Sequence, residues 1–379
     1  MAEFRSNNVE EYFKGKTILV TGATGFLAKT SNPHVAIQRL HNEVFGKELF
    51  NIQRDKWGEK FSSFLSEKVV AVAGDVSLHN FGIKDQTLIQ NMLQDIEIIV
   101  HSAATTKWDE RYDVAMNMNT MGAYNTLNFA KMCPTIQVFL HVSTAFVCGE
   151  RKGLIPEEPF QMGQTLKGSS KLDINLEKKL IEQKLSELHA QNANEETITS
   201  IMTELGTTRA NLHGWQDTYA LTKAMGEMIV TNMKGNIPLI ITRPSGILGT
   251  HSKPFPGWIE GVRTIDFVFV EYFKGEITSF VGDPNITMDL IPADMVANSM
   301  IVALMKSRLK RIINIYRPYF TEPEIIFDDK NTEKLRMTIK GVDNVNREFN
   351  FDPKSIDWKD YLMNVHFPGL LQYAMQPKM

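Results

Sequence analysis

An apolar run that leads into a glycine-rich turn constrains the fold of this chain more than any other sequence feature. Thr17 to Val20 predicts a buried strand, and it continues into Thr21-Gly-Ala-Thr-Gly-Phe-Leu-Ala28. Gly22 and Gly25 then fall on a tight turn of the kind at which a backbone approaches the pyrophosphate of a dinucleotide. Any tight turn from a strand to a helix can use two glycines, so the meaning of the motif depends on its context.

That context is a series of short apolar runs bounded by turn residues, with helical patterns between them. The runs are Thr17 to Val20, Val69 to Ala73, Ile96 to His101, Val138 to Val142 and Leu239 to Thr242. This alternation predicts an α/β fold with a doubly wound, parallel, Rossmann-type sheet, in which ligands bind beyond the carboxyl ends of the strands. The later runs end in the candidate site motifs Gly74-Asp75-Val76, Ser102-Ala103-Ala104, Ser143-Thr144-Ala145 and Arg243-Pro244-Ser245.

A second motif, Tyr219-Ala-Leu-Thr-Lys223, places a phenol and an ammonium one helical turn apart. On a helix the two side chains share one face, where the cation would favour a phenolate and Tyr219 would exchange a proton with a carbonyl oxygen. Thr144, or Ser143 beside it, would donate a hydrogen bond to the same oxygen while hydride arrives at the carbon. The pattern also occurs by accident, with Lys223 as a solvated helix residue. Its combination with the other motifs favours a dinucleotide-dependent reductase.

Asp75 and the cysteines each have a structural and a functional interpretation. Asp75 follows a glycine, which is a common turn pair, but its position at a strand end favours a contact to adenine or its ribose. Cys133 and Cys148 are the only cysteines, too few for a disulfide framework, and no Cys or His spacing suggests a metal. Cys148 lies close to Thr144, yet nothing near it suggests a lowered thiol pKa, so both cysteines are expected to be structural.

The composition excludes several classes of function. With 379 residues, 43% of them hydrophobic, the chain can bury a large core. Its formal charge of -3 and its pI of about 6.3 give no general attraction to nucleic acid, which is not expected as a partner. No apolar run has the length of a signal-peptide core or of a transmembrane helix, so any membrane contact is expected to be peripheral.

The stretch between Glu150 and Asp217 shows no evident strand and predicts a helical insertion. Its leucines and isoleucine recur at helical spacing, which indicates core packing and not a cofactor contact. They are Leu176, Leu180, Ile181, Leu185 and Leu188. From Pro254 onward the chain is aromatic and rich in Gly and Pro, as expected of a substrate-side segment, whereas Lys306 to Arg311 is typical of a solvated face. The predicted domains are a reductase domain over 1–305, with the insertion at 150–217, and a shortened, mainly helical C-terminal domain over 306–379.

These motifs resemble those of the extended short-chain dehydrogenase/reductases, and within them the plant alcohol-forming fatty acyl-CoA reductases with male-sterility-type domains. The resemblance covers nearly the whole chain. It rests on Lys16-Thr-Ile-Leu-Val-Thr-Gly-Ala-Thr-Gly-Phe-Leu-Ala28, His141-Val-Ser-Thr-Ala145, Asp217-Thr-Tyr-Ala-Leu-Thr-Lys223, Pro254-Phe-Pro-Gly-Trp-Ile-Glu-Gly261, Ile291-Pro-Ala-Asp-Met-Val296, Phe327-Asp-Asp-Lys-Asn-Thr-Glu-Lys-Leu-Arg336 and Phe351-Asp-Pro-Lys-Ser-Ile-Asp-Trp358. It implies reduction of a long-chain fatty acyl-CoA by NADPH, first to an aldehyde with loss of coenzyme A and then to a primary alcohol, for waxes, suberin or pollen-wall lipid.

The chain departs from the family pattern in three places. After Ala28 a helix and a strand, roughly 20 residues by ordinary element lengths, are missing before the pattern resumes at Val35. The residue that would distinguish NADP from NAD is missing with them, so the choice of NADPH rests on the resemblance. A second gap after Met305 implies a shortened substrate domain. The third departure is Phe146, which stands where the family usually has Tyr and is expected to be neutral.

The first gap has a predicted consequence for the sheet. In a 3-2-1-4-5-6 order, loss of strand 2 leaves strand 3 unpaired beside strand 1 and exposes two edges. Val69 to Ala73 is therefore expected to move into the vacant place beside Thr17 to Val20 through a right-handed connection. Asp75 would then lie near the ribose site, where its charge would repel a 2'-phosphate.

The predicted site combines the motifs and the resemblance. Its catalytic residues are Tyr219, Lys223, Thr144 and Ser143. Its cofactor contacts are Gly22, Thr24, Gly25, Phe26, Leu27, Asp75, Val76, Ala103, Ala104, Lys223 and Pro244. The first hypothesis is a fatty acyl-CoA reductase that its missing segments weaken or inactivate. Two alternatives stay open: a reductase of a smaller carbonyl, such as a sterol or flavonoid ketone, and a non-catalytic relative that binds acyl chains or pairs with intact paralogues. The expected location is the cytoplasm, with peripheral attachment to the endoplasmic reticulum, where acyl-CoA and alcohol partition, as the second expectation.

Overall fold

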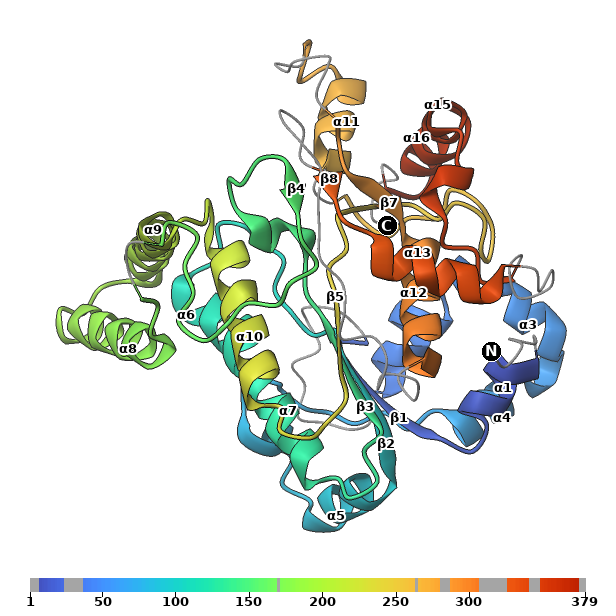
Figure 1. Cartoon of the computed structure of the whole chain (residues 1–379), viewed down its shortest axis with the longest axis horizontal. Coiled ribbons are helices and arrows are strands. Elements are labelled where there is room, and N and C mark those ends of the chain that lie inside the picture. Colours follow the sequence, from blue (N-terminus) through green and yellow to red (C-terminus); the bar gives the residue numbers. More distant parts are fainter. Residues whose placement is uncertain are drawn as a thin grey trace.

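Four parallel strands lie at the centre of the protein in the order β1-β2-β3-β5 (Figure 1). Their bounds are β1 (Thr17–Thr21), β2 (Ile96–His101), β3 (Val138–Val142) and β5 (Leu239–Thr242). The computed structural model describes residues 7–23, 37–168, 171–262, 265–279, 287–306, 326–340 and 348–374. Because all neighbouring strands run parallel, their carboxyl ends meet at one edge of the sheet, as the sequence predicted.

Helices cover both faces of this sheet, which confirms the doubly wound α/β fold. One face carries α5 (Gln86–Asp95), α6 (Tyr112–Ala115), the π-helix η5 (Met116–Met121), α7 (Gly122–Met132) and α10 (Thr218–Met233). Ile99 and Phe139 are fully buried against this layer. The other face carries α1 (Asn7–Phe13) and α12 (Ala293–Lys306). Ile98 and Leu140 are buried there with Leu304, so alternate residues of each strand enter different cores.

The segment from Val69 to Ala73, predicted as a strand beside β1, forms no strand, and that prediction is wrong. The amide of Val69 bonds to the carbonyl of Leu65 at 2.8 Å, and the amide of Asp75 bonds to the carbonyl of Phe81 at 2.8 Å. These two amides, at the ends of the segment, bond to residues a few positions away, and Val70 between them is 79% exposed, so the segment does not enter the sheet. Among the described residues β1 stays an edge strand, and Val20 is 50% exposed.

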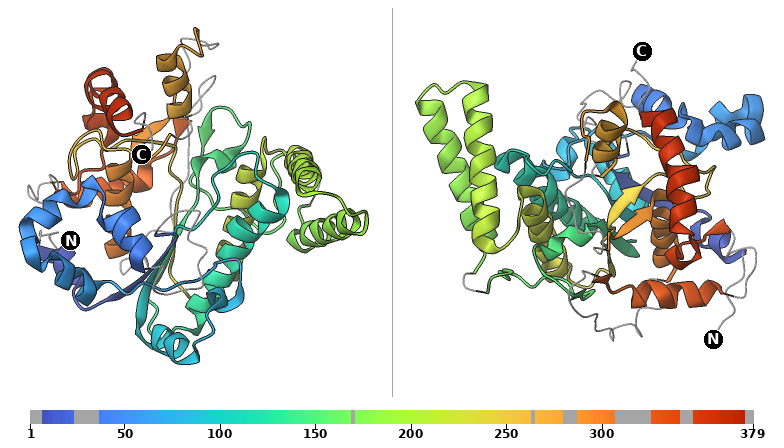
Figure 2. Two further views of the ribbon diagram at one scale, coloured as in Figure 1. Left: turned by 180° about the vertical axis from the view of Figure 1, so that it is seen from behind. Right: turned by 90° about the horizontal axis from the view of Figure 1, so that it is seen from above.

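The predicted helical insertion is a hairpin that projects from the body of the molecule (Figures 1 and 2). It consists of α8 (Ile174–Ala190) and α9 (Glu195–His213). The predicted core packing is confirmed for Ile181 and Leu188, which are buried, whereas Leu176 is 61% exposed. The buried face starts at Ile174 and includes a carboxylate, Glu177.

Glu177 on α8 forms hydrogen bonds that connect the helical hairpin to the sheet domain. Its Oε2 accepts hydrogen bonds from the Tyr112 hydroxyl at 2.8 Å and from Arg209 Nε at 2.9 Å, and its Oε1 lies 3.1 Å from His213 Nε2. Burial acts to raise the pKa of Glu177, but the hydrogen bonds from His213, Arg209 and Tyr112 outweigh it and hold the pKa at about 2. The carboxylate is therefore ionised, and it joins α8, α9 and α6.

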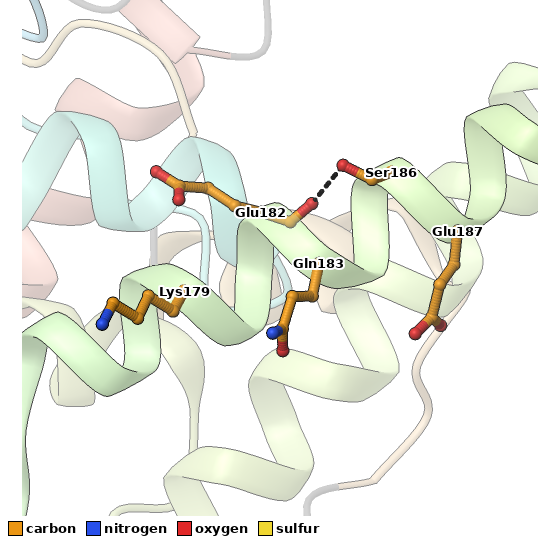
Figure 3. Close-up of a pocket in the computed structure, with 5 residues that line it drawn as sticks. All are labelled: Lys179, Glu182, Gln183, Ser186 and Glu187. Carbon is orange, nitrogen blue, oxygen red and sulfur yellow. Dashed lines mark hydrogen bonds between the residues drawn. The ribbon is translucent and has the colours of Figure 1, made fainter.

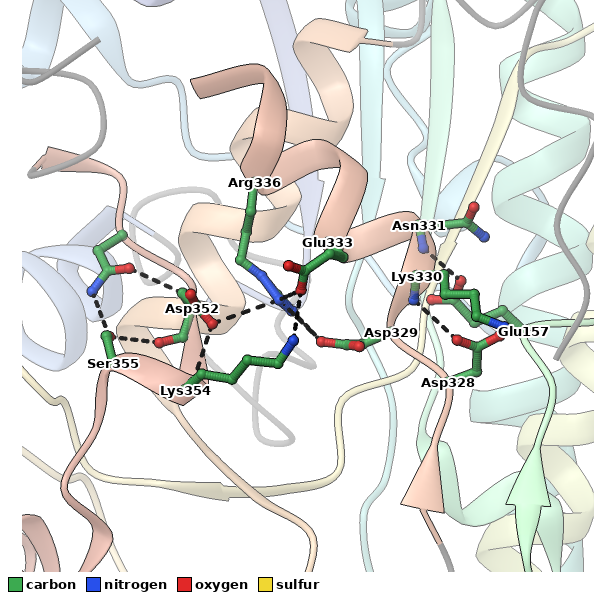
Figure 4. Close-up of polar contacts among 11 residues, drawn as sticks. Glu157, Asp328, Asp329, Lys330, Asn331, Glu333, Arg336, Asp352, Lys354 and Ser355 are labelled. Atoms are coloured by element: carbon green, nitrogen blue, oxygen red, sulfur yellow. Dashed lines mark hydrogen bonds and ion pairs between the residues drawn. The ribbon is translucent and has the colours of Figure 1, made fainter. Parts of the chain in front are cut away.

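Residues 150–217 also contain a strand that the sequence did not indicate. β4 (Leu154–Ile155) pairs in parallel with β8 (Ile326–Phe327) and so connects the start of the insertion to the C-terminal region. Close to this pair, Glu157 Oε2 accepts from the amide of Asn331 at 3.3 Å (Figure 4). On α13 (Lys330–Ile339), the buried Arg336 bonds to Asp329 and Glu333. The figure shows these charges on the side of α13 that faces Lys354.

The described residues of 306–379 are mainly helical, as predicted, and they pack against a small sheet formed by the preceding segment. β6 (Gly246–Leu248) pairs with β7 (Leu290–Pro292), and the helices beside them are α11 (Ile265–Lys274), α15 (Trp358–Asp360), η9 (Tyr361–His366), α16 (Phe367–Gly369) and η10 (Leu370–Ala374). One core joins Leu248 and Val302 to Ile339 and Tyr361. This core crosses residue 305, and the domain boundary there stays a prediction.

The remaining helices are short. They are η1 (Leu40–Phe45), η2 (Glu48–Phe50), α3 (Asn51–Trp57), η3 (Gly58–Lys60), α4 (Phe61–Lys68), η4 (His79–Gly82), η6 (Ala145–Cys148) and η8 (Pro353–Ser355). Across the described ranges, none of the helices has the length and apolar character to cross a bilayer. The basic cluster from Lys306 to Arg311 lies beyond the described residues apart from the backbone of its first member.

Candidate active site

The turn after β1 brings the backbones of two strands together. Gly22 has a φ of 77°, and a Cβ at this position would lie 2.8 Å from Ala103 Cα. Thr21 Oγ1 accepts hydrogen bonds from the amides of Ser102 and Ala103, each at 3.2 Å. A side chain at Gly22 would be strained and would overlap Ala103, so the turn requires glycine. Two predicted cofactor contacts therefore lie side by side. The predicted contacts Thr24, Gly25, Phe26 and Leu27 lie outside the described residues.

The loop after β3 is held in place by the loop after β5. The amide of Ala145 donates to the carbonyl of Pro244 at 2.8 Å. Thr144 caps η6, because its Oγ1 accepts from the amide of Phe146 at 3.3 Å. Ser143 is buried, and its Oγ has no hydrogen-bond partner within the described part of the chain. The predicted residues Ser143, Thr144 and Pro244 are thus brought together at one edge of the sheet.

Helix α10 carries Tyr219 and Lys223 on one face, as their spacing predicted. Asp217 caps the helix, with its Oδ1 accepting a first-turn amide at 2.7 Å. Thr144 lies beside Tyr219, and its hydroxyl acts to lower the pKa of the phenol. Lys223 Nζ donates to the carbonyl of Val142, the last residue of β3, at 2.6 Å. Thr144, Tyr219 and Lys223 therefore surround the carboxyl end of β3.

Burial shifts the pKa values of both residues on α10. It raises the pKa of Tyr219 to about 12, while the neighbouring hydroxyl of Thr144 acts to lower it. It lowers the pKa of Lys223 to about 8, against the attraction of Glu227. The expectation that Lys223 favours a phenolate is not confirmed, since its ammonium bonds to a backbone carbonyl and Tyr219 stays a neutral phenol at pH 7. A neutral phenol is the form that can donate a proton.

Asp75 and Val76 lie in a tight turn after α4. Asp75 Oδ1 accepts from the amide of Ser77 at 2.9 Å and from its hydroxyl at 2.7 Å, as an ordinary turn residue does. The carbonyl of Val76 accepts from Asn125 Nδ2 on α7 at 3.0 Å. Without a strand at Val69 to Ala73, the reason given for placing Asp75 beside the ribose is lost, and its cofactor contact stays a prediction.

Sequence reasoning missed Asn119, a buried residue that links two parts of the site. It lies on η5, where its Oδ1 accepts from the amide of Thr105 at 3.0 Å and its Nδ2 donates to Thr222 Oγ1 at 3.0 Å. It thereby connects the loop after Ala104 to the helix that carries Tyr219. A π-helix has no distinctive apolar period, so the sequence held no signal for this placement.

A buried ion pair next to Lys223 was also missed. Glu227 is one helical turn after Lys223 and fully buried, and its two oxygens bond to Arg243 Nη2 at 2.6 Å and Nε at 2.8 Å. Arg243 Nη2 also donates to the carbonyl of Glu158 at 2.8 Å. Arg243 follows β5 directly, so the pair fixes α10 against the sheet. The sequence places both residues near motifs, but only the packing of α10 shows that they meet.

Two stacked imidazoles lie beneath the site. The rings of His101 and His141 are 5.3 Å apart on neighbouring strands. Burial, with the nearby charge of Lys223, lowers the pKa of His101 to about 3 and that of His141 well below its ordinary value, so both are neutral.

Within the described ranges, no group of three or more His, Cys, Asp or Glu could hold a metal ion.

A shallow depression on α8 lies apart from this site (Figure 3). Its lining side chains are all exposed and come from one face of the projecting hairpin: Lys179, Glu182, Gln183, Ser186 and Glu187. Because it has no buried or apolar wall, it offers no enclosed site for a substrate.

The fold and the site together define a dinucleotide-binding reductase of the short-chain dehydrogenase/reductase type. Two family models, both described as male sterility protein, match residues 27–300 and 284–377. The chain is 39% identical to fatty acyl-CoA reductase 8 of Arabidopsis thaliana, with 96% of this chain and 98% of the relative covered. It is 37% identical to the alcohol-forming fatty acyl-CoA reductase of Simmondsia chinensis, with 97% and 99% covered. The chain belongs to the male sterility protein family, and it is similar to these fatty acyl-CoA reductases over nearly their whole length.

Structure comparison supports the same fold. The terminal R domain from the myxalamid PKS-NRPS biosynthetic pathway superposes with a TM-score of 0.50 at 17% identity, covering 91% of this chain and 80% of that domain. The alignment with the Arabidopsis relative spans 489 positions, about a hundred more than the 379 residues of this chain. The relative therefore has internal segments that this chain lacks. The predicted positions of the gaps, after Ala28 and after Met305, border residues outside the described ranges.

Proposed function

We propose that this chain reduces a long-chain acyl-CoA to a primary alcohol with NADPH. The observation that carries the proposal is the group of Thr144, Tyr219 and Lys223 at the end of β3, in a chain of this family. A nicotinamide cofactor supplies hydride in such a site. Gly22, with a φ of 77°, forms a tight turn directly after β1, which is where a dinucleotide-binding fold brings its backbone close to the pyrophosphate.

Tyr219 is suited to act as the proton donor in both reduction steps. When hydride adds to the thioester carbon, Tyr219 gives its proton to the carbonyl oxygen and Thr144 donates a hydrogen bond to it. The carbon–sulfur bond then breaks, the hydroxyl proton moves to the departing sulfur, and coenzyme A leaves as a free thiol with an aldehyde remaining. For the second reduction, Tyr219 would first regain a proton from solvent and would then donate it to the aldehyde oxygen, while a second NADPH would supply the hydride to the aldehyde carbon.

Lys223 contributes through its position. Its ammonium is fixed on the carbonyl of Val142 and is buried one turn from Tyr219. A cation there stabilises negative charge that develops on the substrate oxygen. The choice of NADPH over NADH follows the family resemblance.

The test is a product assay with matched tyrosine variants. The purified protein, palmitoyl-CoA and NADPH should yield hexadecanol and free thiol, and Tyr219→Phe should lower the rate about 10²–10⁴-fold by removing the proton donor. Tyr12→Phe is the control, because Tyr12 packs on the opposite face of the sheet and its buried hydroxyl has no partner within the described residues. It should leave the rate unchanged.

The other outcomes identify the alternatives. Turnover of a small ketone without release of thiol would replace the acyl-CoA proposal with reduction of a smaller carbonyl. A folded protein that neither binds NADPH in a fluorescence titration nor turns over would favour the non-catalytic relative. Tighter binding of NADH than of NADPH would overturn the cofactor assignment alone.

We also propose a cytoplasmic location with peripheral attachment to the endoplasmic reticulum, and a role in wax, suberin or pollen-wall lipid. The support is chemical, since long acyl chains and fatty alcohols partition into membranes. Fractionation of cells that express the tagged chain tests the location. Recovery in a compartment other than cytosol or endoplasmic reticulum would contradict it.

A further inference from the structure

Two exposed aromatic side chains meet beside the catalytic group. Trp108, at the tip of the loop after β2, is 51% exposed, and Phe146, two residues after Thr144, is 36% exposed. Their ring centroids are 6.2 Å apart at an interplanar angle of 53°. Large rings that remain in contact with both water and each other form an apolar surface that a ligand can cover.

The loop that carries Trp108 is anchored at both ends. Thr105 Oγ1 donates to Glu110 Oε2 at 3.1 Å, and both residues are buried. Thr203 Oγ1 on α9 donates to the carbonyl of Asp109 at 3.4 Å. These contacts hold Trp108 at a closed turn between the sheet and the helical hairpin. A ring presented in this way loses little further freedom when it binds a ligand.

The backbone around Phe146 is also anchored. Its neighbours Ala145 and Val147 are buried, and the carbonyl of Val147 accepts from Trp215 Nε1 at 2.9 Å. Its own amide donates to Thr144 Oγ1, and Thr144 lies beside Tyr219. The aromatic pair therefore begins within two residues of the group that receives the carbonyl.

We propose that Trp108 and Phe146 bind the acyl chain of the substrate, close to its carbonyl end. This inference rests on the proposed function and adds the site that recognises the chain. A tilted ring pair has no parallel slot for the flat adenine of coenzyme A, whereas a flexible methylene chain can follow both ring surfaces. Covering exposed aromatic carbon with methylene groups is favourable in proportion to the apolar area removed from water.

Calorimetry without NADPH tests the proposal, because binding then occurs without turnover. The ligands are decanoyl-CoA and free coenzyme A, each titrated into the full-length protein. Trp108→Ala and Phe146→Ala should each weaken decanoyl-CoA binding about tenfold and leave coenzyme A binding within about twofold. Trp108→Phe should retain most of the affinity, because it keeps an apolar ring.

A second exposed tryptophan provides the matched control. Trp57 on α3 is 37% exposed and stacks on Phe64 at 4.2 Å, in a segment far from α10 (Figure 1). Trp57→Ala should change neither affinity. Melting temperatures of all variants within a few degrees of the parent would show that the fold is retained.

Two results would overturn the aromatic site. Unchanged decanoyl-CoA binding in both alanine variants would show that the chain lies elsewhere, and an equal loss for free coenzyme A would move the pair to the nucleotide or pantetheine part of the ligand. Failure of the proposed function is distinguishable from either. In that case the parent protein would bind decanoyl-CoA with the predicted loss in the variants, but would release no thiol with NADPH.

Discussion

Replacing Gly22 by alanine should destabilise the fold and weaken cofactor binding at the same time. With a φ of 77°, an alanine here costs about 1–2 kcal/mol for the left-handed backbone. Its Cβ would also lie 2.8 Å from Ala103 Cα and 2.9 Å from Ala103 N. Since the obstacle is backbone, β1 and β2 must move apart at their ends, at a cost of about 1–3 kcal/mol. The expected total is about 2–5 kcal/mol.

Gly15 provides a control for the backbone component. It has a φ of 71°, precedes β1 by two residues, and a Cβ on it would meet nothing within 4 Å. Gly15→Ala should therefore cost only the 1–2 kcal/mol or so of backbone strain. Both changes restrict the unfolded chain equally, so this effect cancels in the comparison.

Urea unfolding followed by circular dichroism gives the free energy of unfolding for both variants, and an NADPH titration gives the affinity. Gly22→Ala should lose at least about 1 kcal/mol more stability than Gly15→Ala, and it alone should lose NADPH affinity. Equal destabilisation would show that the contact with Ala103 is not tight. Unchanged NADPH affinity in Gly22→Ala would show that the turn after β1 does not approach the cofactor.

Three further predictions concern buried charges. The pKa of Glu177 is held at about 2, so the ionised carboxylate stabilises the fold by about 3 kcal/mol above pH 4.5, and this contribution is lost as the pH falls toward 2. Glu177→Gln should therefore make the free energy of unfolding depend less on pH in this range. The exposed Glu182→Gln should leave the pH dependence unchanged. The pKa of Lys223 is lowered to about 8 in the folded protein. Between about pH 8 and 10.5 the unfolded chain therefore keeps a proton on Lys223 that the folded chain has lost, so the free energy of unfolding should rise with pH. Lys223→Met should abolish this rise. Arg243→Met should cost about 3–5 kcal/mol of unfolding free energy, because it leaves Glu227 buried and unpaired, and a loss below about 1 kcal/mol would contradict the ion pair.

The strands were predictable because a buried parallel strand forms a short run of consecutive apolar residues in the sequence. Each of the runs at β1, β2, β3 and β5 was located within one residue of its observed bounds. The run from Val69 to Ala73 has the same composition but is not a strand. Val70 in this run is 79% exposed, so a short apolar run by itself established neither burial nor pairing with a strand edge.

Part of the candidate site was likewise predictable from the sequence, and part was not. Local spacing placed Tyr219 and Lys223 on one helical face, and the strand end placed Thr144 near them. Spacing could not show that Lys223 would bond to the carbonyl of Val142, or that burial would raise the pKa of Tyr219 to about 12. Both depend on how deeply α10 packs against the sheet.

The amino-acid sequence by itself determined the sheet strands, the glycine turn and the helical spacing of the proton donor and its cation, since each depends on residues within a few positions of one another. Only the tertiary structure decided which edge of the sheet stays bare, that Glu227 meets Arg243, that Asn119 links two loops, and that Trp108 meets Phe146. These contacts join residues far apart in the chain. Their formation depends on the free energy of packing and desolvation in the assembled fold, which no local pattern contains.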